Sequence, residues 1–123
     1  MNQEFPSISV VIPSWNQGRF IGRTLDSILK QDYPGEVQVI VSDGGSTDET
    51  VDVLKSYGDR LTWWSARDKG FVGAVTEGVA RATGEILAVQ SSDDYYLPGA
   101  FRAMAAAFQK YPAASFISGR VFD

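Results

Sequence analysis

Residues 86–95 read Ile86-Leu87-Ala88-Val89-Gln90-Ser91-Ser92-Asp93-Asp94-Tyr95, an apolar run that ends in two adjacent carboxylates. Adjacent carboxylates repel each other and are stable in water or beside a cation. One interpretation is a solvated turn in which Asp93 or Asp94 caps the next helix. The other is a site for a hard divalent cation that carries a phosphorylated ligand, because Mg²⁺ and Mn²⁺ prefer carboxylate oxygens. The residues that share this edge of the fold decide between the two.

Three earlier apolar runs, residues 8–12, 37–41 and 61–64, also read as strands. Apolar residues recur at helical spacing after each run and again after the stretch quoted above. We expect Pro13 to end the first strand, and Ser46 with Glu49 to form a capping box that starts the second helix. Residues 114–123 read as a fifth strand. This alternation predicts one α/β domain over residues 1–123, with a mainly parallel sheet and helices on both faces, in three α/β/α layers.

Composition removes several classes of function. The chain has 123 residues and a net charge of −4, which disfavours a nucleic-acid or anionic-membrane surface. It contains no cysteine and no histidine, so disulfides, zinc–thiolate sites and Ser–His triads are excluded. No stretch approaches the roughly 18 apolar residues of a membrane span, and no signal peptide is evident. We expect a soluble cytoplasmic protein or module, with any membrane anchor outside the given residues.

Acidic residues follow the ends of the predicted strands. Asp43 follows the second strand, Asp68 the third, and Asp93 with Asp94 the fourth. The carboxyl ends of parallel strands share one sheet edge, where ligands bind. Neither a P-loop nor a G-x-G-x-x-G turn is present, which disfavours P-loop NTPases and dinucleotide redox folds. A diphosphate would need a bridging cation at such an edge. The residues therefore indicate a metal–nucleotide site.

Five segments in this order also resemble family 2 glycosyltransferases of the GT-A fold, over essentially the whole chain. They are Val10-Val11-Ile12-Pro13-Ser14-Trp15-Asn16, Val41-Ser42-Asp43-Gly44-Gly45-Ser46-Thr47-Asp48-Glu49-Thr50, Asp68-Lys69-Gly70, Ala82-Thr83-Gly84-Glu85-Ile86 and Ser92-Asp93-Asp94. The resemblance implies an inverting transferase that moves a sugar from a nucleotide diphosphate-sugar, most often a UDP-sugar, to a hydroxyl acceptor. That acceptor would be a glycan, a lipid-linked molecule or another hydroxyl compound.

The resemblance also implies roles for individual residues. Asp43 would hydrogen-bond the base, and Asp68 would line the nucleoside pocket. Asp93 and Asp94 would occupy the D-x-D-type motif, with Asp93 toward the ribose and Asp94 as a ligand of Mn²⁺ or Mg²⁺. The residues that would border the base are Pro13, Ser14, Trp15 and Asn16.

In this family the acid that deprotonates the acceptor lies beyond the nucleotide-binding half. We therefore expect no catalytic base before Asp123, and we interpret the chain as the donor-binding half of a longer enzyme. Apolar surface left uncovered would permit self-association. Two alternatives stay open: a non-catalytic α/β module with a degenerate nucleotide site, and a nucleotidyltransferase. The second lacks the expected glycine- and basic-rich phosphate loop near the N-terminus.

Overall fold

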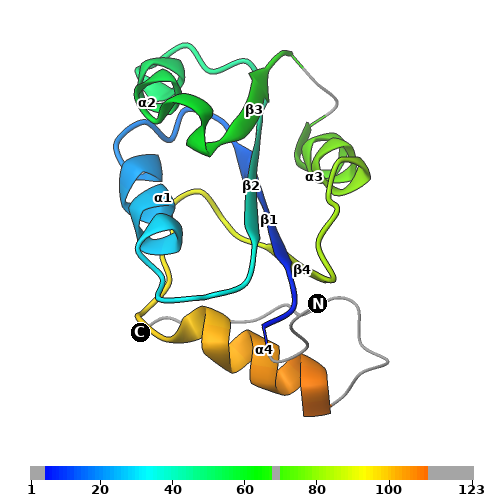
Figure 1. The fold of residues 1–123 in the computed structure, drawn as a ribbon. Helices are drawn as coiled ribbons and strands as arrows, with labels where there is room; N and C mark the ends of the chain where they lie inside the picture. The colour runs from blue at the N-terminus through cyan, green and yellow to red at the C-terminus, as the bar shows by residue number, and fades with distance from the viewer. Residues whose placement is uncertain (1–4, 68–69, 111–123) are drawn as a thin grey trace.

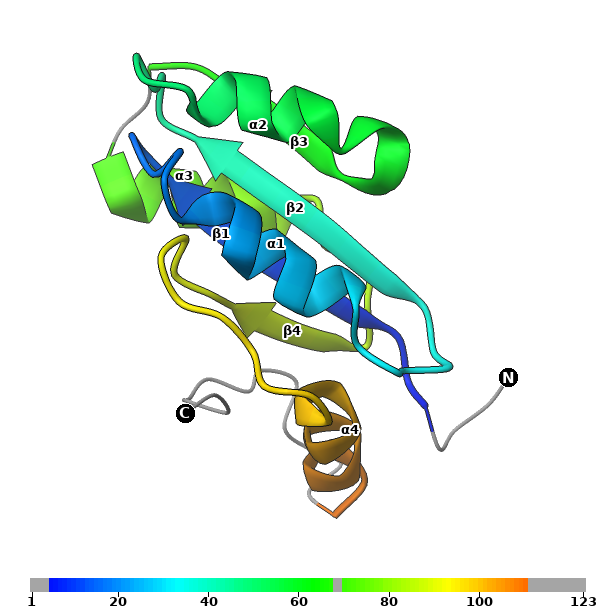
Figure 2. The same cartoon turned by 90° about the vertical axis from the view of Figure 1, so that its left-hand side faces the viewer.

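A parallel four-stranded sheet organises the protein (Figures 1 and 2). The computed structural model describes residues 5–67 and 70–110, so the predicted fifth strand lies outside the described residues. The strand order is β3-β2-β1-β4, and all three pairings are parallel. This arrangement confirms the predicted sheet. Its strands are β1 (Ile8–Ser14), β2 (Val37–Asp43), β3 (Thr62–Ser65) and β4 (Ile86–Val89).

Helices cover both faces of the sheet, as predicted. In Figure 1 the sheet is seen edge-on, with α1 and α2 on one side and α3 on the other. Figure 2 shows β4 beside β1 and α4 beyond β4. None of the helices within the described ranges is long and apolar enough to cross a membrane. The helices are α1 (Ile21–Leu29), α2 (Thr50–Ser56), α3 (Gly70–Ala80) and α4 (Ala100–Lys110), with a short 3-10 turn, η1 (Gly58–Arg60), after α2.

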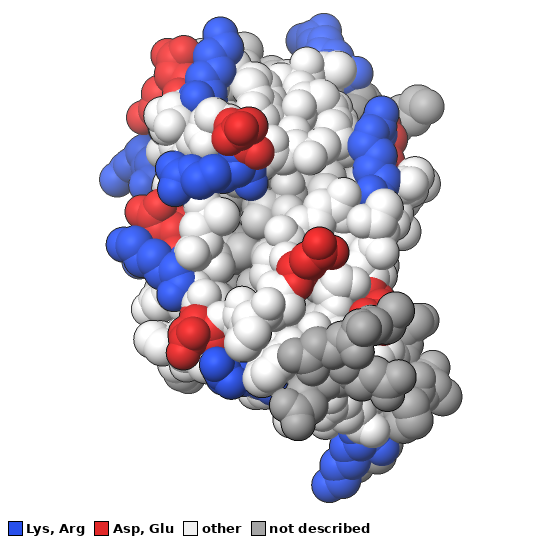
Figure 3. Space-filling view, viewed as in Figure 1, with Lys and Arg blue, Asp and Glu red and all other residues white. Residues whose placement is uncertain are grey.

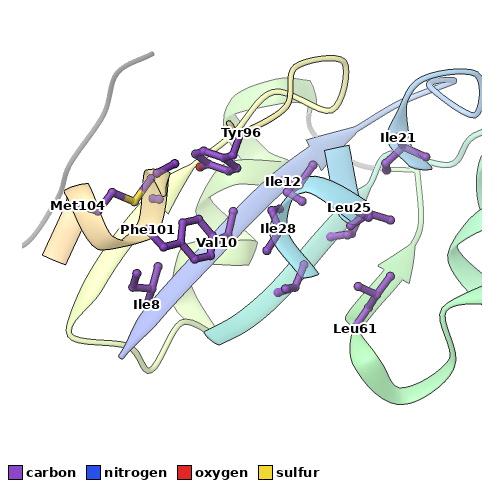
Figure 4. Close-up of a cluster of buried hydrophobic side chains, with 14 of the residues drawn as sticks. Ile8, Val10, Ile12, Ile21, Leu25, Ile28, Leu61, Tyr96, Phe101 and Met104 are labelled. Atoms are coloured by element: carbon purple, nitrogen blue, oxygen red, sulfur yellow. The ribbon is translucent and has the colours of Figure 1, made fainter. Parts of the chain in front are cut away.

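The main core lies between the sheet and the layer of α1 and α4. All seven residues of β1 are buried, as expected for a strand whose apolar residues do not alternate with polar ones. Figure 4 shows Phe101 and Met104 of α4 grouped with Tyr96, next to the start of β1. The rings of Tyr96 and Phe101 meet edge to face, with centroids 5.2 Å apart. These contacts fix the segment between β4 and α4 to the core.

On the opposite face, α3 approaches the sheet very closely. Gly78 is buried, and a Cβ placed on it would lie 2.4 Å from Cγ1 of Val11, a residue with no exposed surface. A glycine inside a helix costs about 1 kcal/mol relative to alanine. Here that cost is offset by close helix–sheet packing, which any side chain at position 78 would prevent.

The prediction that Pro13 ends the first strand was wrong. β1 continues to Ser14, and Pro13 stands in register with Ser42 of β2. The Ser14 carbonyl accepts a hydrogen bond from Gly44 N on the β2 side, while the Val11 carbonyl accepts one from Gln90 N on the β4 side. Because these directions alternate along a strand, the missing N–H of Pro13 faces the β4 side, where pairing already ends at Val89. Proline therefore ends only one of the two ladders.

The predicted capping box was also wrong. The residue before α2 is Glu49, which makes no side-chain cap hydrogen bond. The Ser46 hydroxyl donates instead to the Asp43 carboxylate, while Asp48 Oδ1 accepts a 2.9 Å hydrogen bond from Thr50 N. The Asp48 carboxylate, two residues before Thr50, thus supports the start of the helix. Ser46 instead stabilises the loop before the helix through its bond to Asp43.

Candidate functional site

A pocket of about 780 Å³ lies at the carboxyl ends of the strands. Every strand contributes to its wall: Pro13 and Ser14 end β1, Gly44 follows β2, Arg67 follows β3, and Ser91 with Ser92 follows β4. Trp15 and Gln17 from the β1–α1 loop, with Gly70, Phe71 and Ala74 from the first turns of α3, complete it. The predicted convergence of these segments on one edge is therefore observed. A smaller pocket, about 390 Å³, lies at the amino ends of the strands, where ligands of open parallel sheets do not usually bind.

Asp43 lies beneath this pocket as a buried hydrogen-bonding centre. Its side chain is 1% exposed, and each carboxylate oxygen accepts two hydrogen bonds. Oδ1 accepts from the hydroxyls of Ser14, at 2.9 Å, and Ser46, at 2.7 Å. Oδ2 accepts from Ser46 N at 2.8 Å and from the Ser65 hydroxyl at 2.7 Å. The carboxylate thus joins the ends of β1, β2 and β3 to the loop after β2.

The loops after β1 and β2 are tied together along their length. Asn16 has a left-handed backbone, with φ of 51°, a conformation that asparagine adopts more readily than most residues. Its Oδ1 accepts hydrogen bonds from Thr47 N and Asp48 N, and its own N–H donates to Ser46 Oγ at 2.8 Å. Gly18 N donates to Asp48 Oδ2 at 3.1 Å. Asn16 therefore acts on the loops and is absent from the pocket lining that the structure describes.

Hydrogen bonds to its side chain lower the pKa of Asp48. Burial acts to raise its pKa, but hydrogen bonds from the hydroxyl and N–H of Thr50 and from Gly18 N outweigh that effect, so the pKa lies below its ordinary value. Asp48 is exposed, and it is one of the contacts that hold together the two loops of the pocket.

The stretch after β4 is held by α1. Thr24 Oγ1 lies within hydrogen-bonding reach of the carbonyls of Ser92, at 3.0 Å, and Asp94. Ser27 Oγ accepts a 2.9 Å hydrogen bond from Tyr96 N. The spacing of apolar residues in the helix does not show that Thr24 and Ser27 bond the segment after β4. Sequence reasoning therefore missed this role. Thr24 and Ser27 fix the backbone of the paired aspartates.

Asp93 and Asp94 border the pocket and do not line it. Asp93 is exposed, and its Oδ1 accepts a 2.5 Å hydrogen bond from Ser91 Oγ. Asp94 is half-buried, and its N–H donates to the Ser91 carbonyl at 3.3 Å. The pair therefore lies in a solvated turn, as one interpretation predicted, and it remains accessible beside Ser91 and Ser92 of the pocket wall. The cation site stays a prediction.

These two carboxylates suit a hard divalent cation in their chemistry. Within the described ranges no group of three or more acidic side chains is placed to hold a metal ion. Mg²⁺, however, is commonly bound through one or two carboxylates together with substrate phosphates. The side chain of Asp94 accepts no hydrogen bond from the residues that the structure describes, which leaves its oxygens available. The donor set fits a cation that arrives with a phosphorylated ligand.

Arg67 is the charged side chain among the described residues that line the pocket, and sequence reasoning missed it. It is exposed and makes no ion pair within the described part of the chain. On the face seen in Figure 3, acidic and basic side chains are interspersed along the α1 and α2 side and form no patch of one sign. A lone cation in a pocket attracts anions, so this pocket suits a phosphorylated ligand better than the predicted acidic edge alone would.

Two large aromatic side chains also stand at the pocket. Trp15 is 61% exposed and Phe71 is 68% exposed, although both line the cavity. Such surfaces are available for stacking against a planar group. Trp15 was predicted from the sequence. Phe71 was not, because at the start of α3 it reads as an ordinary apolar helix residue.

The remaining predicted residues have different outcomes. Pro13 and Ser14 lie in the pocket wall, and their contact with a nucleotide base stays a prediction. Asp68 lies outside the described residues.

Gln90, directly before the pocket residues Ser91 and Ser92, is 3% exposed, and its side-chain nitrogen has no hydrogen-bond partner in the described structure. It does not line the pocket, so it contributes no further site.

Comparison with known proteins places this geometry in a family. The family described as Glycosyl transferase family 2 matches residues 9–123. A PGL/p-HBAD biosynthesis glycosyltransferase of Mycobacterium bovis is 36% identical over 107 residues, which cover 84% of this chain and 41% of that protein.

Solved structures agree with this match. A crystal structure of S. aureus TarS in complex with UDP-GlcNAc superposes with a TM-score of 0.77 at 27% identity, over 86% of this chain and 32% of that one. The mannosyltransferase PcManGT from Pyrobaculum calidifontis, in complex with GDP-Man and Mn²⁺, superposes with a TM-score of 0.74 at 27% identity, over 82% and 32%. The chain thus spans less than half the length of the proteins that it matches.

Proposed function

This chain belongs to glycosyl transferase family 2, and from that membership we propose that it forms the donor-binding part of a glycosyltransferase. The donor is a nucleotide diphosphate-sugar, with a UDP-sugar as the first choice. The reaction of the whole enzyme is transfer of the sugar, with inversion, to an acceptor hydroxyl. Relatives named as glycosyltransferases support a transferase over a non-catalytic module.

The observation that carries the proposal is the composition of the pocket at the carboxyl ends of the strands. It combines an exposed aromatic side chain, Trp15, with the positive charge of Arg67, and Asp93 and Asp94 directly follow its wall residues Ser91 and Ser92. A nucleotide diphosphate needs a stacking surface for its base, positive charge for its phosphates and hydrogen-bond partners for its ribose. The cavity of about 780 Å³ is within the usual size range for a small-molecule site.

Within this proposal the base lies against Pro13, Ser14 and Trp15, over the buried carboxylate of Asp43. Asp68 lines the nucleoside part, as the family resemblance implies, and Asn16 holds the surrounding loops in place. TarS, solved with UDP-GlcNAc and with UDP, supports a uridine donor. PcManGT, solved with GDP-Man, keeps a guanosine donor as the alternative.

Asp94, with Asp93 beside it, would hold Mn²⁺ or Mg²⁺ through carboxylate oxygens. When bound, such a cation stabilises negative charge on the departing nucleotide diphosphate. Asp93 also lies toward the ribose and can accept a hydrogen bond from its hydroxyls. Arg67 supplies a second positive charge for the phosphates, at the side of the pocket formed by β3 and α3.

Isothermal titration calorimetry with UDP in the presence and absence of Mn²⁺ tests the proposal. We expect binding that Mn²⁺ strengthens, and we expect Asp94→Asn to abolish that strengthening. The matched control is Asp52→Asn, because Asp52 is an exposed carboxylate on α2 away from the pocket. Absence of UDP binding by the wild-type chain, or equal losses in both variants, would contradict a localised metal–nucleotide site.

A further inference from the structure

We propose that Thr24 and Ser27 of α1 are positioning residues for the divalent cation, because they hold the turn that presents Asp93 and Asp94. The inference rests on the proposed function, since it concerns the cation of the same site. Neither hydroxyl belongs to the pocket wall that the structure describes, so both act through the backbone of the segment after β4. Their loss should weaken the effect of the cation and leave the nucleotide's own contacts intact.

Residues 90–99 connect β4 to α4 without forming a helix or a strand. The buried backbone groups of such a segment need hydrogen-bond partners outside regular secondary structure. Figure 2 shows the segment passing beside α1, and three side chains of that helix supply partners to residues 92–101. They are Thr24, Ser27 and Gln31, and their spacing of three and four positions places them on one face of α1.

Thr24 makes the contact nearest the aspartates. The residue has no exposed surface, and its Oγ1 lies within hydrogen-bonding reach of two carbonyls, those of Ser92, at 3.0 Å, and Asp94. These carbonyls flank Asp93 in the sequence, so one hydroxyl spans the turn that carries both carboxylates. The two carbonyls share a single proton. Replacing Thr24 by valine, which has nearly the same shape, would leave both carbonyls without this donor.

Ser27 holds the next part of the segment. Its Oγ donates to the Thr24 carbonyl at 2.6 Å and accepts a 2.9 Å hydrogen bond from Tyr96 N, so the hydroxyl acts as both donor and acceptor. Arg23 adds a cation–π contact, with its guanidinium carbon 4.4 Å from the centre of the Tyr95 ring. The helix therefore contacts this segment before, within and after the paired aspartates.

The carboxylates themselves have few contacts that could orient them. Asp93 is exposed, and its Oδ1 accepts one hydrogen bond, from Ser91 Oγ. Neither Asp93 nor Asp94 forms an ion pair within the described part of the chain. Their positions are therefore set mainly by the backbone, which α1 holds. Replacing a residue that orients a metal ligand without touching the metal typically changes metal affinity by about 10- to 100-fold.

Gln31 distinguishes this role from simple stabilisation of the connection. It makes the same kind of contact at the far end of the segment, where Nε2 donates to the Leu97 carbonyl at 2.9 Å and Oε1 accepts from Phe101 N at 3.1 Å. If α1 only stabilised the connection, loss of Gln31 would affect the cation as much as loss of Thr24. If α1 positions the aspartates, the contact beside them matters most.

The test measures UDP affinity by calorimetry with and without Mn²⁺ in the wild-type chain and three variants. In Thr24→Val we expect the strengthening by Mn²⁺ to fall by about tenfold, with UDP affinity unchanged when Mn²⁺ is absent. Thr24→Ser, which keeps the hydroxyl, and Gln31→Met should retain the strengthening. Hydrogen exchange of the ligand-free chain adds a readout that needs no metal. The Asp94 amide should exchange faster in Thr24→Val, and the Phe101 amide in Gln31→Met.

Unchanged strengthening in Thr24→Val overturns the inference, as does an equal loss in Thr24→Ser or Gln31→Met. In each of these cases, UDP binding that Mn²⁺ strengthens in the wild type leaves the proposed function standing. If a thermal scan shows that Thr24→Val does not fold, Ser27→Ala takes its place under the same criteria, because Ser27 is only half-buried. A wild-type chain whose UDP binding is absent or independent of Mn²⁺ overturns both the inference and the proposed function.

Discussion

Replacing Asp43 should reveal how much stability the buried carboxylate gives to the strand ends. Asp43→Ala removes the acceptor of four hydrogen bonds, from Ser14, Ser65 and two groups of Ser46. Removing one partner of a buried hydrogen bond costs about 1–3 kcal/mol. Only the Ser14 bond is fully buried, and the other donors can turn partly to water. We therefore expect a loss of about 2–4 kcal/mol in the free energy of unfolding.

Asp43→Asn should be much milder, because the amide can orient to match the donors. Its oxygen can take the place of Oδ2, which faces the N–H of Ser46, a group that can only donate. Its NH₂ group then faces the hydroxyls of Ser14 and Ser46, which can rotate and accept. We expect a loss of about 1 kcal/mol.

Urea unfolding followed by circular dichroism measures both effects, with Asp59→Ala as the control, since Asp59 is an exposed carboxylate in η1. The control should stay within about 0.5 kcal/mol of the wild type. In a thermal scan, each kcal/mol corresponds to about 4 °C in Tm for a chain of this length. Asp43→Ala within 0.5 kcal/mol of the wild type would refute the reasoning, as would a larger loss in Asp43→Asn than in Asp43→Ala.

Three further predictions follow from single contacts. Gly78→Ala should lose about 1–3 kcal/mol in urea unfolding, because its Cβ would overlap Val11; a stability equal to the wild type would contradict the close packing. Arg67→Gln should weaken UDP about fivefold to tenfold in calorimetry and leave uridine unchanged, since only UDP carries phosphates; equal weakening of both would contradict a phosphate contact. Burial and the Asp26 carboxylate raise the pKa of Tyr57 to about 12, so its stabilising contribution is complete below pH 10 and is lost toward pH 12. The alkaline loss in urea midpoint should be smaller in Tyr57→Phe, and an identical loss would exclude this tyrosine as its source.

Much of the fold could be predicted because its strands stand out in the sequence as apolar runs. Residues 8–12 are β-branched at all but one position, and burial on both faces follows from that pattern. The alternation of strands and helices then restricts the topology to a parallel sheet with crossovers. The predicted placement of chemistry at one sheet edge followed from this topology and needed no knowledge of side-chain positions.

The local errors came from side chains that make long-range contacts. Ser46 matches the sequence signature of a helix cap, but the Asp43 carboxylate competes for its hydroxyl. Pro13 matches a strand stop, but only the β4 ladder ends there. Local sequence patterns cannot show which hydrogen-bond partner a side chain takes when a competing partner lies on another strand.

The electrostatic character of the site was also only partly predictable. The sequence shows acids after the strands, yet Asp43 is enclosed by hydroxyls and Asp93 faces solvent. Arg67 follows the short strand β3 inside a charged loop, where nothing in the local sequence separates a pocket residue from a solvated one. Its position in the wall depends on a contact that is distant in sequence, since Arg67 lies against Gly45 of the loop after β2.

A crystal structure of the chain grown with UDP and Mn²⁺ tests the central claim most directly. We predict density for the nucleotide in the pocket at the carboxyl ends of the strands, with the uracil ring against Trp15. The metal should lie on Asp94. Density for UDP at the amino ends of the strands, beside Glu36 and Arg60, would contradict the claim.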